Sequence, residues 1–449
     1  MTAGIARASL RSRPAAFAGT FIALLFASIA VSASVMLLAS ASPTGLSAAE
    51  RRQLADSDLT DIATILLIGS IYMAIFVVAS TMGTAVAQQQ REFAMLRAIG
   101  ARPWQIRRAA AVQAAAAAIP AALLGFALGA GLGRLWFHGM VTHGLIPPAV
   151  TFTFSWLALP IALAVATVTS TVAGIIAASR LAGLRPARAV AESTTPRRGL
   201  GVIRTVLGLL AIGGGAALSS VAAHQATDKA TQSAFLVLIL FCAGVGLLGP
   251  RIIGPAAALA SLLLRPFGPA AQAAMLNIRS QPRRFSAAIV PVVLAVAFGT
   301  TKIALHTTAQ HVTGTAGDPA GVWMDYTGTA LYTGFAAIAA ANTLAMLSHE
   351  RRKDLALLRL ASATPGQLRL MAAWEAVLVT LTSLLLGAAI AIATLIPILR
   401  GTLHTTTPYL PATATTAITA GTLLLTLIAI ALPVQAALRH RPTETAKGA

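Results

Sequence analysis

Two stretches of the sequence bring together arginine, acidic and glutamine side chains at a repeated spacing. The first, QQQREFAMLRAIGARPWQIRRAA at residues 88–110, carries five arginines and one glutamate, although only 10% of the whole chain is charged. The second, KDLALLRLASATPGQLRLMAAWE, occupies residues 353–375. Arginines and carboxylates form strong charge-assisted hydrogen bonds to partner molecules. No nucleophile with a neighbouring base and no metal-ligand spacing stands out, so the chemistry we expect is binding rather than catalysis.

The two stretches are related by an internal repeat. Aligned at an offset of 262 residues, they are identical at nine of the 23 positions from 91 to 113. The identities include Leu96 with Leu358, Pro103 with Pro365 and Gln105 with Gln367. Farther upstream, LRSRPAAF at residues 10–17 resembles IRSQPRRF at 278–285, at an offset of 268. Two collinear matches predict that the chain contains two copies of one unit.

Each stretch is predicted to form a helix, a turn and a second helix. Strong helix formers dominate the segment that precedes the first turn. Gly100 is suited to end a helix, and Pro103 is suited to the first turn of the next one. An ordinary basic loop beside a membrane would explain the arginines, but not the shared leucine, proline and glutamine. We therefore interpret the two turns as docking sites for a repeated partner.

The elements that hold these turns are predicted to be membrane helices. The chain has 449 residues, 57% of them hydrophobic, and a mean hydropathy of +0.78. A membrane-spanning helix needs about 20 apolar residues, and runs of this length indicate an all-α integral membrane protein with about ten spans. We expect a short interfacial helix at 250–264. The expected spans are 16–40, 62–86, 111–136, 154–180, 201–222, 233–249, 285–305, 329–348, 373–397 and 413–436.

The basic residues predict the orientation of the spans. With the N-terminus in the cytoplasm, 27 of the 33 Lys and Arg residues fall on the cytoplasmic side, as the positive-inside rule requires. Both termini and both turns are then cytoplasmic, and the net charge of +20 needs no nucleic-acid partner. The abundance of arginine and alanine is typical of a GC-rich bacterial genome, so we expect a bacterial cytoplasmic membrane. The six basic residues on the outer side are Arg51, Arg52, Arg134, Lys229, Lys302 and Arg400.

The repeat predicts the domain organisation. Residues 1–192 form the first four-span repeat, 200–264 the two linker spans and the interfacial helix, and 268–449 the second four-span repeat. An even number of spans precedes the second repeat, so the two repeats are expected to insert in parallel. The outer loops 41–61 and 306–328 are about 20 residues each, which leaves no large extracytoplasmic domain.

Both stretches resemble the signature of the FtsX-like permease family, the membrane subunits of MacB-type ABC transporters. The shared features are a charged pair, an LRAIGA-like core, a Q(I/L)R sequence and a glutamate, and LRPARAVAE at 184–192 resembles the family's basic tail. The resemblance covers nearly the whole chain. The sequence departs from the signature at Gln113, which replaces the glutamate, and at Ser362, which replaces the glycine.

The resemblance implies that each turn contacts a cytoplasmic ATPase subunit. The residues that it assigns to ATPase coupling are Arg91, Glu92, Leu96, Arg97, Gly100, Pro103, Trp104, Gln105, Arg107, Lys353, Asp354, Leu358, Arg359, Pro365, Gln367, Arg369 and Glu375. The sequence has no Gly-x-x-x-x-Gly-Lys-Ser/Thr phosphate loop. We therefore expect no enzymatic activity and no cofactor in this chain, with ATP and Mg²⁺ bound by two copies of the partner ATPase.

The expected function is export of hydrophobic or amphiphilic molecules, such as lipids, peptides or antibiotics. One alternative is a mechanotransmission or sensing module that couples the ATPase to an external or membrane partner without moving cargo. An ion-coupled transporter is a third hypothesis, but it predicts acids within the spans, and none is convincingly placed. Outer-side histidines are expected to be solvated rather than to form a metal or pH-sensing site; they are His138, His143, His224, His306, His311 and His404.

Overall fold

The fold consists of long helices. The computed structural model describes residues 14–41, 59–98, 100–148, 150–182, 202–224, 227–262, 264–280, 282–315, 317–350 and 352–439. Within these residues there is no strand, and ten helices are long and apolar enough to cross a membrane. Each coincides with one of the ten expected spans, so the predicted all-α membrane fold is confirmed. The chain divides into two compact units.

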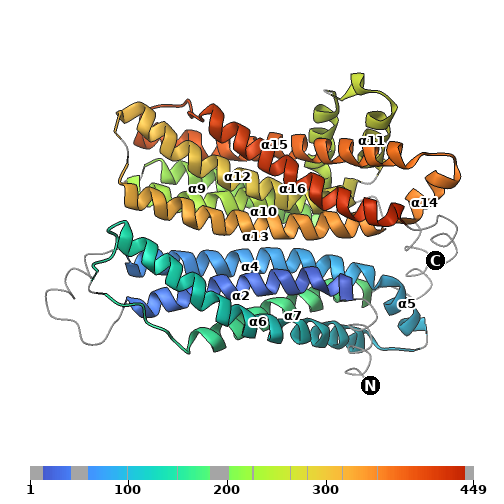
Figure 1. Cartoon of the computed structure of the whole chain (residues 1–449), viewed down its shortest axis with the longest axis horizontal. Helices are drawn as coiled ribbons and strands as arrows, with labels where there is room; N and C mark the ends of the chain where they lie inside the picture. The colour runs from blue at the N-terminus through green and yellow to red at the C-terminus, as the bar shows by residue number, and fades with distance from the viewer. Residues whose placement is uncertain are drawn as a thin grey trace. The chain divides into compact units, whose positions relative to one another are not determined.

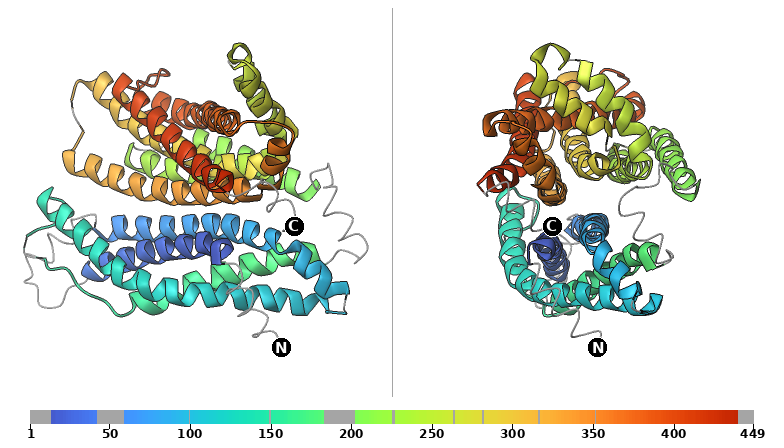
Figure 2. Two further views of the ribbon diagram at one scale, coloured as in Figure 1. Left: turned by 45° about the vertical axis from the view of Figure 1, so that its right-hand side comes forward. Right: turned by 90° about the vertical axis from the view of Figure 1, so that its right-hand side faces the viewer.

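The first unit contains residues 1–198 and 318–339. Its helices lie side by side (Figures 1 and 2). Small side chains fill much of the interior, because Ala118, Ala121 and Ala122 pack around Leu24 and Val78. The helices are α2 (Pro14–Ser40), α4 (Leu59–Gln88), α5 (Gln90–Ala98), α6 (Pro103–Thr142), α7 (Ala158–Ala182) and the first part of α13 (Pro319–Glu350).

A stripe of glycines on α6 lets this helix lie directly against α2. A Cβ atom added at Gly125 would lie 2.4 Å from Cβ of Ser28, and one added at Gly129 would lie 2.7 Å from the carbonyl oxygen of Ile29. Gly133 continues the stripe one turn farther along. Small residues at such spacing allow close backbone approach between membrane helices. Glycine is therefore required here by packing.

The N-terminal part of α13 packs within the first unit, although its sequence belongs to the second repeat. The ring of Trp323 lies where a Cβ on Gly139 of α6 would be, and the Tyr332 ring lies against Gly69 of α4. Asp318–Ala339 are consequently part of the first unit. The compact units therefore do not coincide with the two expected sequence repeats, because the aromatic side chains of α13 pack against the glycines of α4 and α6.

The second unit contains residues 199–317 and 340–449. The two linker helices, α9 and α10, pack against each other through Gly208, which faces Leu248, and Gly244, which faces Ile212. The hydroxyl of Ser219 on α9 donates to the α15 carbonyl of Thr394 at 3.4 Å. The linker is thus built into this unit. Its elements are α9 (Val202–Ala222), α10 (Thr227–Leu262), η1 (Arg265–Phe267), α11 (Pro269–Ser280), α12 (Pro282–Thr313), the end of α13, α14 (Arg352–Leu360), α15 (Pro365–Thr402) and α16 (Ala412–Leu438).

Two short segments differ from expectation. The segment 250–264 is not a separate interfacial helix, because α10 continues through Pro250 and Pro255 to Leu262. Prolines are tolerated within membrane helices when neighbouring groups satisfy the freed backbone atoms. A short amphipathic helix does occur, but it is α11, which the sequence analysis did not predict. The expected outer loop 306–328 is mostly helical, since α12 ends at Thr313 and α13 begins at Pro319.

Candidate partner-docking turns

The first turn joins α5 to α6 and is closed by backbone hydrogen bonds. The N–H of Gly100 donates to the carbonyl of Arg97 at 3.1 Å, and the N–H of Ala101 donates to the carbonyl of Leu96 at 2.9 Å. This pair of bonds is a Schellman motif, which ends a helix through one residue in the left-handed conformation. Gly100 takes that conformation with φ of 97°. The predicted role of Gly100 as a helix stop agrees with this geometry.

The second turn joins α14 to α15 and has the same backbone geometry. The N–H of Ser362 donates to the carbonyl of Arg359 at 3.2 Å, and the N–H of Ala363 donates to the carbonyl of Leu358 at 2.9 Å. Ser362 has φ of 79°, a conformation that costs a non-glycine residue about 1–2 kcal/mol. The serine that departs from the family signature therefore does not change the shape of the turn.

The helix that follows each turn begins with the same glutamine bond. Oε1 of Gln105 accepts from the backbone N–H of Arg102 at 2.8 Å, and Oε1 of Gln367 accepts from that of Thr364 at 2.9 Å. In the second turn, Oγ1 of Thr364 also accepts from the N–H of Gln367 at 3.3 Å, which completes a capping box. The first turn has one half of the box, because the guanidinium of Arg102 has no acceptor atom.

The residues shared by the two stretches thus have local structural roles. Pro103 and Pro365 occupy the first position of α6 and α15, where the missing N–H is not needed. The shared leucines provide the carbonyls that close the turns, and the shared glutamines cap the following helices. The repeated pattern therefore specifies the shape of the turn, and the exposed side chains must provide any recognition of a partner.

The two turns bury different side chains beneath them. In the first, Phe93 and Ile106 are buried and Leu96 packs against their cluster. In the second, Leu355 is buried, but Leu358, the counterpart of Leu96, is 41% exposed. At this position, the second turn therefore exposes an apolar side chain that the first turn packs against its buried cluster.

The exposed side chains combine apolar and basic groups on both turns. Trp104 is 50% exposed, and Arg107 beside it is also exposed. Arg369 is exposed on the second turn, next to Leu370. Of the other candidates, Gly100, Pro103, Asp354, Pro365 and Gln367 are exposed, Glu92, Arg97, Gln105 and Arg359 are partly buried, and the side chains of Arg91 and Lys353 lie outside the described residues.

Comparison with models of known families finds the C-terminal domain of FtsX-like permeases twice, at residues 64–186 and 328–442. The chain belongs to the FtsX-like permease family. Each match contains one of the two turns, which confirms the predicted repeat. The chain is accordingly a multi-pass membrane protein, the permease subunit of an ABC transporter that associates with an ABC ATPase partner. A search of curated proteins found no match.

One candidate residue of the permease lies away from the exposed turns. Glu375 on α15 is 1% exposed, and its carboxylate accepts a hydrogen bond from the side-chain amide of Asn277 on α11. Its counterpart in the first half, Gln113, is also buried, and neither atom of its side-chain amide has a hydrogen-bond partner in the structure. Glu375 therefore holds α11 against α15 rather than presenting a surface to the ATPase.

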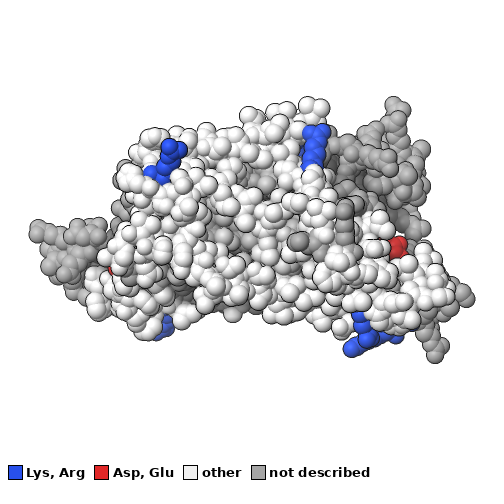
Figure 3. Space-filling view, turned by 90° about the horizontal axis from the view of Figure 1, so that it is seen from above, with Lys and Arg blue, Asp and Glu red and all other residues white. Residues whose placement is uncertain are grey.

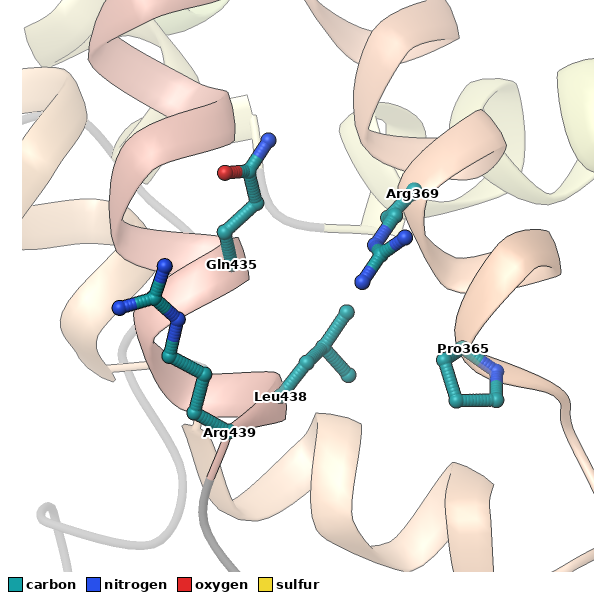
Figure 4. Close-up of a pocket in the computed structure, with 5 residues that line it drawn as sticks. All are labelled: Pro365, Arg369, Gln435, Leu438 and Arg439. Atoms are coloured by element: carbon teal, nitrogen blue, oxygen red, sulfur yellow. The ribbon is translucent and has the colours of Figure 1, made fainter.

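Arg359 of the permease links its turn to the last helix. Its Nη1 donates to the carbonyl of Leu438, at the end of α16, at 3.3 Å. Beside this bond is a pocket of about 300 Å³ between α15 and α16. Figure 4 shows the side chains that line it, which are Pro365, Arg369, Gln435, Leu438 and Arg439.

The sequence analysis missed this pocket because α16 is distant along the chain. Gln435 and Arg439 had no feature that distinguished them from other residues at the end of a basic-flanked span. Only the packing of α16 against α15 brings them to Arg369.

Two of the histidines that the sequence analysis expected on the outer side, His143 and His311, are exposed, and each also makes a ring contact. His143 stacks on Trp323 with ring centroids 4.6 Å apart, and His311 stacks on Tyr409 at 4.2 Å. Among the described residues there is no group of three or more His, Cys, Asp or Glu side chains that could hold a metal ion. These two histidines therefore help to pack the helix ends.

Proposed function

We propose that the permease exports hydrophobic or amphiphilic molecules, driven by ATP that a separate ATPase subunit hydrolyses. The observation that carries the proposal is the pair of preformed turns, each with exposed basic and apolar side chains, in the two segments that match the permease family. A turn whose shape is fixed by its own hydrogen bonds can transmit movement of a bound ATPase to the spans that follow it.

The apolar surface of the spans supports the proposal that the cargo enters the permease from the bilayer. Large apolar side chains are exposed along α7 and α16, including Val168, Ile176, Leu424 and Leu432. Figure 3 shows a face that is mostly free of charged side chains, with a few Lys, Arg, Asp and Glu residues near its margins. A hydrophobic or amphiphilic molecule can lie against such a surface without desolvating a charge.

Transport in vesicles tests the proposal. The permease and its ATPase would be reconstituted into liposomes, and ATP-dependent movement of fluorescent lipid and dye cargoes would be measured alongside ATP hydrolysis. We expect movement of at least one cargo class that requires both subunits. Hydrolysis that the permease stimulates without movement of any cargo would instead support the mechanotransmission alternative.

The proposed complex has two ATPase subunits for each permease, because one chain provides both turns. ATP and Mg²⁺ would be bound by the ATPase, without a cofactor in the permease. Native mass spectrometry of the purified complex should give one permease with two ATPase copies. A complex with two permease chains for each ATPase pair would contradict this stoichiometry.

The proposed orientation places both turns and both termini in the cytoplasm of a bacterium. Single cysteines would be introduced at Ala101, Ala363 and Ala223 in a Cys242→Ser background. We expect an impermeant thiol reagent applied to intact cells to label only the position at Ala223. Labelling of either turn from outside would contradict the orientation.

A further inference from the structure

The pocket between α15 and α16 has the side chains of an anion site. Figure 4 shows Arg369 extending from α15 towards Leu438 of α16, while Gln435 and Arg439 extend from α16 itself. Each guanidinium offers five N–H donors, and the amide of Gln435 adds two more. Neither Asp nor Glu is among the five residues that line the pocket.

A third arginine raises the positive potential of this pocket. Arg359 donates to the carbonyl of Leu438, a residue that lines the pocket. This bond uses one lone pair of the carbonyl and brings a positive charge to the pocket wall. An anion bound here would lie between the side chains of Arg369 and Arg439, in a pocket whose wall also carries the charge of Arg359.

One face of α16 changes from apolar to polar as it reaches the pocket. Leu424, Ile428 and Leu432 are exposed and recur every four residues, so they lie in one row along the helix. Gln435 follows Leu432 by three residues and Arg439 follows Gln435 by four, so both lie on the same face of the helix. The exposed fraction of Leu432 is 61%, so the apolar part of the row lies open to the bilayer directly before the polar groups begin.

We propose that this pocket binds the phosphate of an anionic phospholipid, with an acyl chain along the row of exposed apolar residues on α16. Arginine pairs with phosphate through two parallel hydrogen bonds, and basic pockets between membrane helices at the bilayer surface bind acidic headgroups. A carboxylate of the ATPase could use the same arginines, but it would not need the apolar row that leads to them. The proposal depends on membrane insertion of the chain and is independent of the proposed export.

The first half of the permease provides the matched control. Arg107 is the counterpart of Arg369 at the offset of 262 residues. If the ends of α7 and α16 are aligned, Ser179 takes the place of Gln435, and its hydroxyl donates to the carbonyl of Ile175 at 2.6 Å. At this position the first half therefore has a short hydroxyl side chain in place of the long amide of Gln435.

The test is made on the full-length permease without the ATPase. The protein would be purified from nanodiscs that contain phosphatidylglycerol and phosphatidylcholine in equal amounts, and the retained lipids would be quantified by mass spectrometry. We expect phosphatidylglycerol to be enriched on the native protein and its apparent affinity to fall about tenfold in Arg439→Gln. Arg439→Lys should retain part of the enrichment, and Arg107→Gln should retain all of it.

Two further arms distinguish the source of the phosphate and the class of partner. Inorganic phosphate would be added to the permease in nanodiscs of phosphatidylcholine alone, and we expect no rise in the midpoint of thermal unfolding of the permease. A rise that is lost in Arg439→Gln would show that the pocket binds free phosphate. Equal enrichment of phosphatidylglycerol on the native protein and on Arg439→Gln would overturn the proposal. Arg439→Gln should also leave ATPase pull-down intact, and loss of the ATPase together with unchanged lipid binding would assign the pocket to the partner protein.

Discussion

The two turns of the permease have the same backbone but different surfaces. Gly100 and Ser362 close them with equivalent hydrogen bonds in the same left-handed conformation. The surface of the first turn contains Trp104, whose counterpart in the second is Gly366, whereas the second exposes Leu358 instead of burying it. The comparison teaches that the repeat preserves the backbone shape of the turn and allows the side chains exposed on it to diverge.

The same comparison extends to the helices that follow the turns. Gly125 lies against Ser28 in the first half, and Gly387 lies against Val296 in the second. These four residues are related by the same two offsets, 262 and 268, that align the sequences. The close crossing of the two helices is therefore part of the repeat, and the difference between the halves lies in how far the glycine stripe continues.

Charge reversal on the turns should have the largest effect and would test whether their different surfaces are used equally. In Arg97→Glu with Arg107→Glu, we expect affinity for the ATPase to fall by a factor of about 10–100, because reversed charges repel groups that formerly attracted them. The matched change, Arg359→Glu with Arg369→Glu, should be less severe, since that turn lacks a tryptophan anchor. Pull-down and permease-stimulated ATP hydrolysis would measure both.

The control for this prediction comes from the structure. Arg359 also holds the end of α16 through the carbonyl of Leu438, so its replacement can weaken the fold as well as ATPase binding. The single variant Arg369→Glu keeps this bond and therefore tests ATPase binding by the second half alone. Permease abundance and thermal unfolding would be measured for every variant. Normal association in all the charge-reversed variants would show that these arginines only determine topology.

Breaking the glycine stripe should have an intermediate effect that is greater in the first half. Gly129→Ala places a methyl group 2.7 Å from a backbone oxygen of α2, and we expect the free energy of unfolding to fall by about 2 kcal/mol. Gly387→Ala meets Cγ1 of Val296 at 2.5 Å and Cβ at 2.8 Å, but no backbone atom within 3 Å. The methyl group Cγ1 can rotate away and Cβ cannot, so a slightly smaller loss of about 1.5 kcal/mol is expected. Denaturant titration in detergent would measure both changes.

Gly131 is the matched control on the same helix. A Cβ atom there has nothing within 4 Å, so Gly131→Ala should leave stability unchanged or raise it by up to about 1 kcal/mol. If Gly129→Ala and Gly131→Ala behaved alike, close contact between α2 and α6 would not be the reason for the glycines.

Exchange of the residues that close the turns should have the smallest effect. Gly100→Ser places a side chain at φ of 97°, and we expect a loss of about 1 kcal/mol. Ser362→Gly should gain less than that, because the greater freedom of glycine in the unfolded chain offsets part of the relief. Thermal unfolding of the two variants would show opposite shifts. Shifts of the same sign would mean that the two turns do not share one conformational requirement.

Local and periodic features of the fold could be predicted from the sequence. Hydrophobic runs located the ten spans, and the repeat located both turns, because helix formation and turn closure depend on neighbouring residues. The continuation of α10 through Pro250 was not predicted, since it depends on surrounding helices. The same reason applies to the N-terminal part of α13, whose aromatic rings pack against glycines of α4 and α6.

The sequence predicted only part of the candidate site, because contacts between residues distant along the chain are not visible in it. The exposure of Trp104 and Arg107 follows from their place next to a turn. Glu375 looked like a member of the same motif, but it is covered by α11 and bonded to Asn277. A single sequence gives no indication of that contact, which joins residues 98 positions apart.

The hydrogen bonds that close each turn also affect the thermodynamics of assembly. Ordering the backbone of one flexible residue costs about 1–2 kcal/mol in conformational entropy, and a docking loop that ordered on binding would lose that amount of affinity for every residue fixed. In the permease, the bonds of Gln105 and Gln367 hold the residues between the helices before any partner arrives. In the proposed complex, an ATPase that binds these turns would therefore lose little affinity to ordering of the backbone, and each turn would move with the bound subunit as a rigid body.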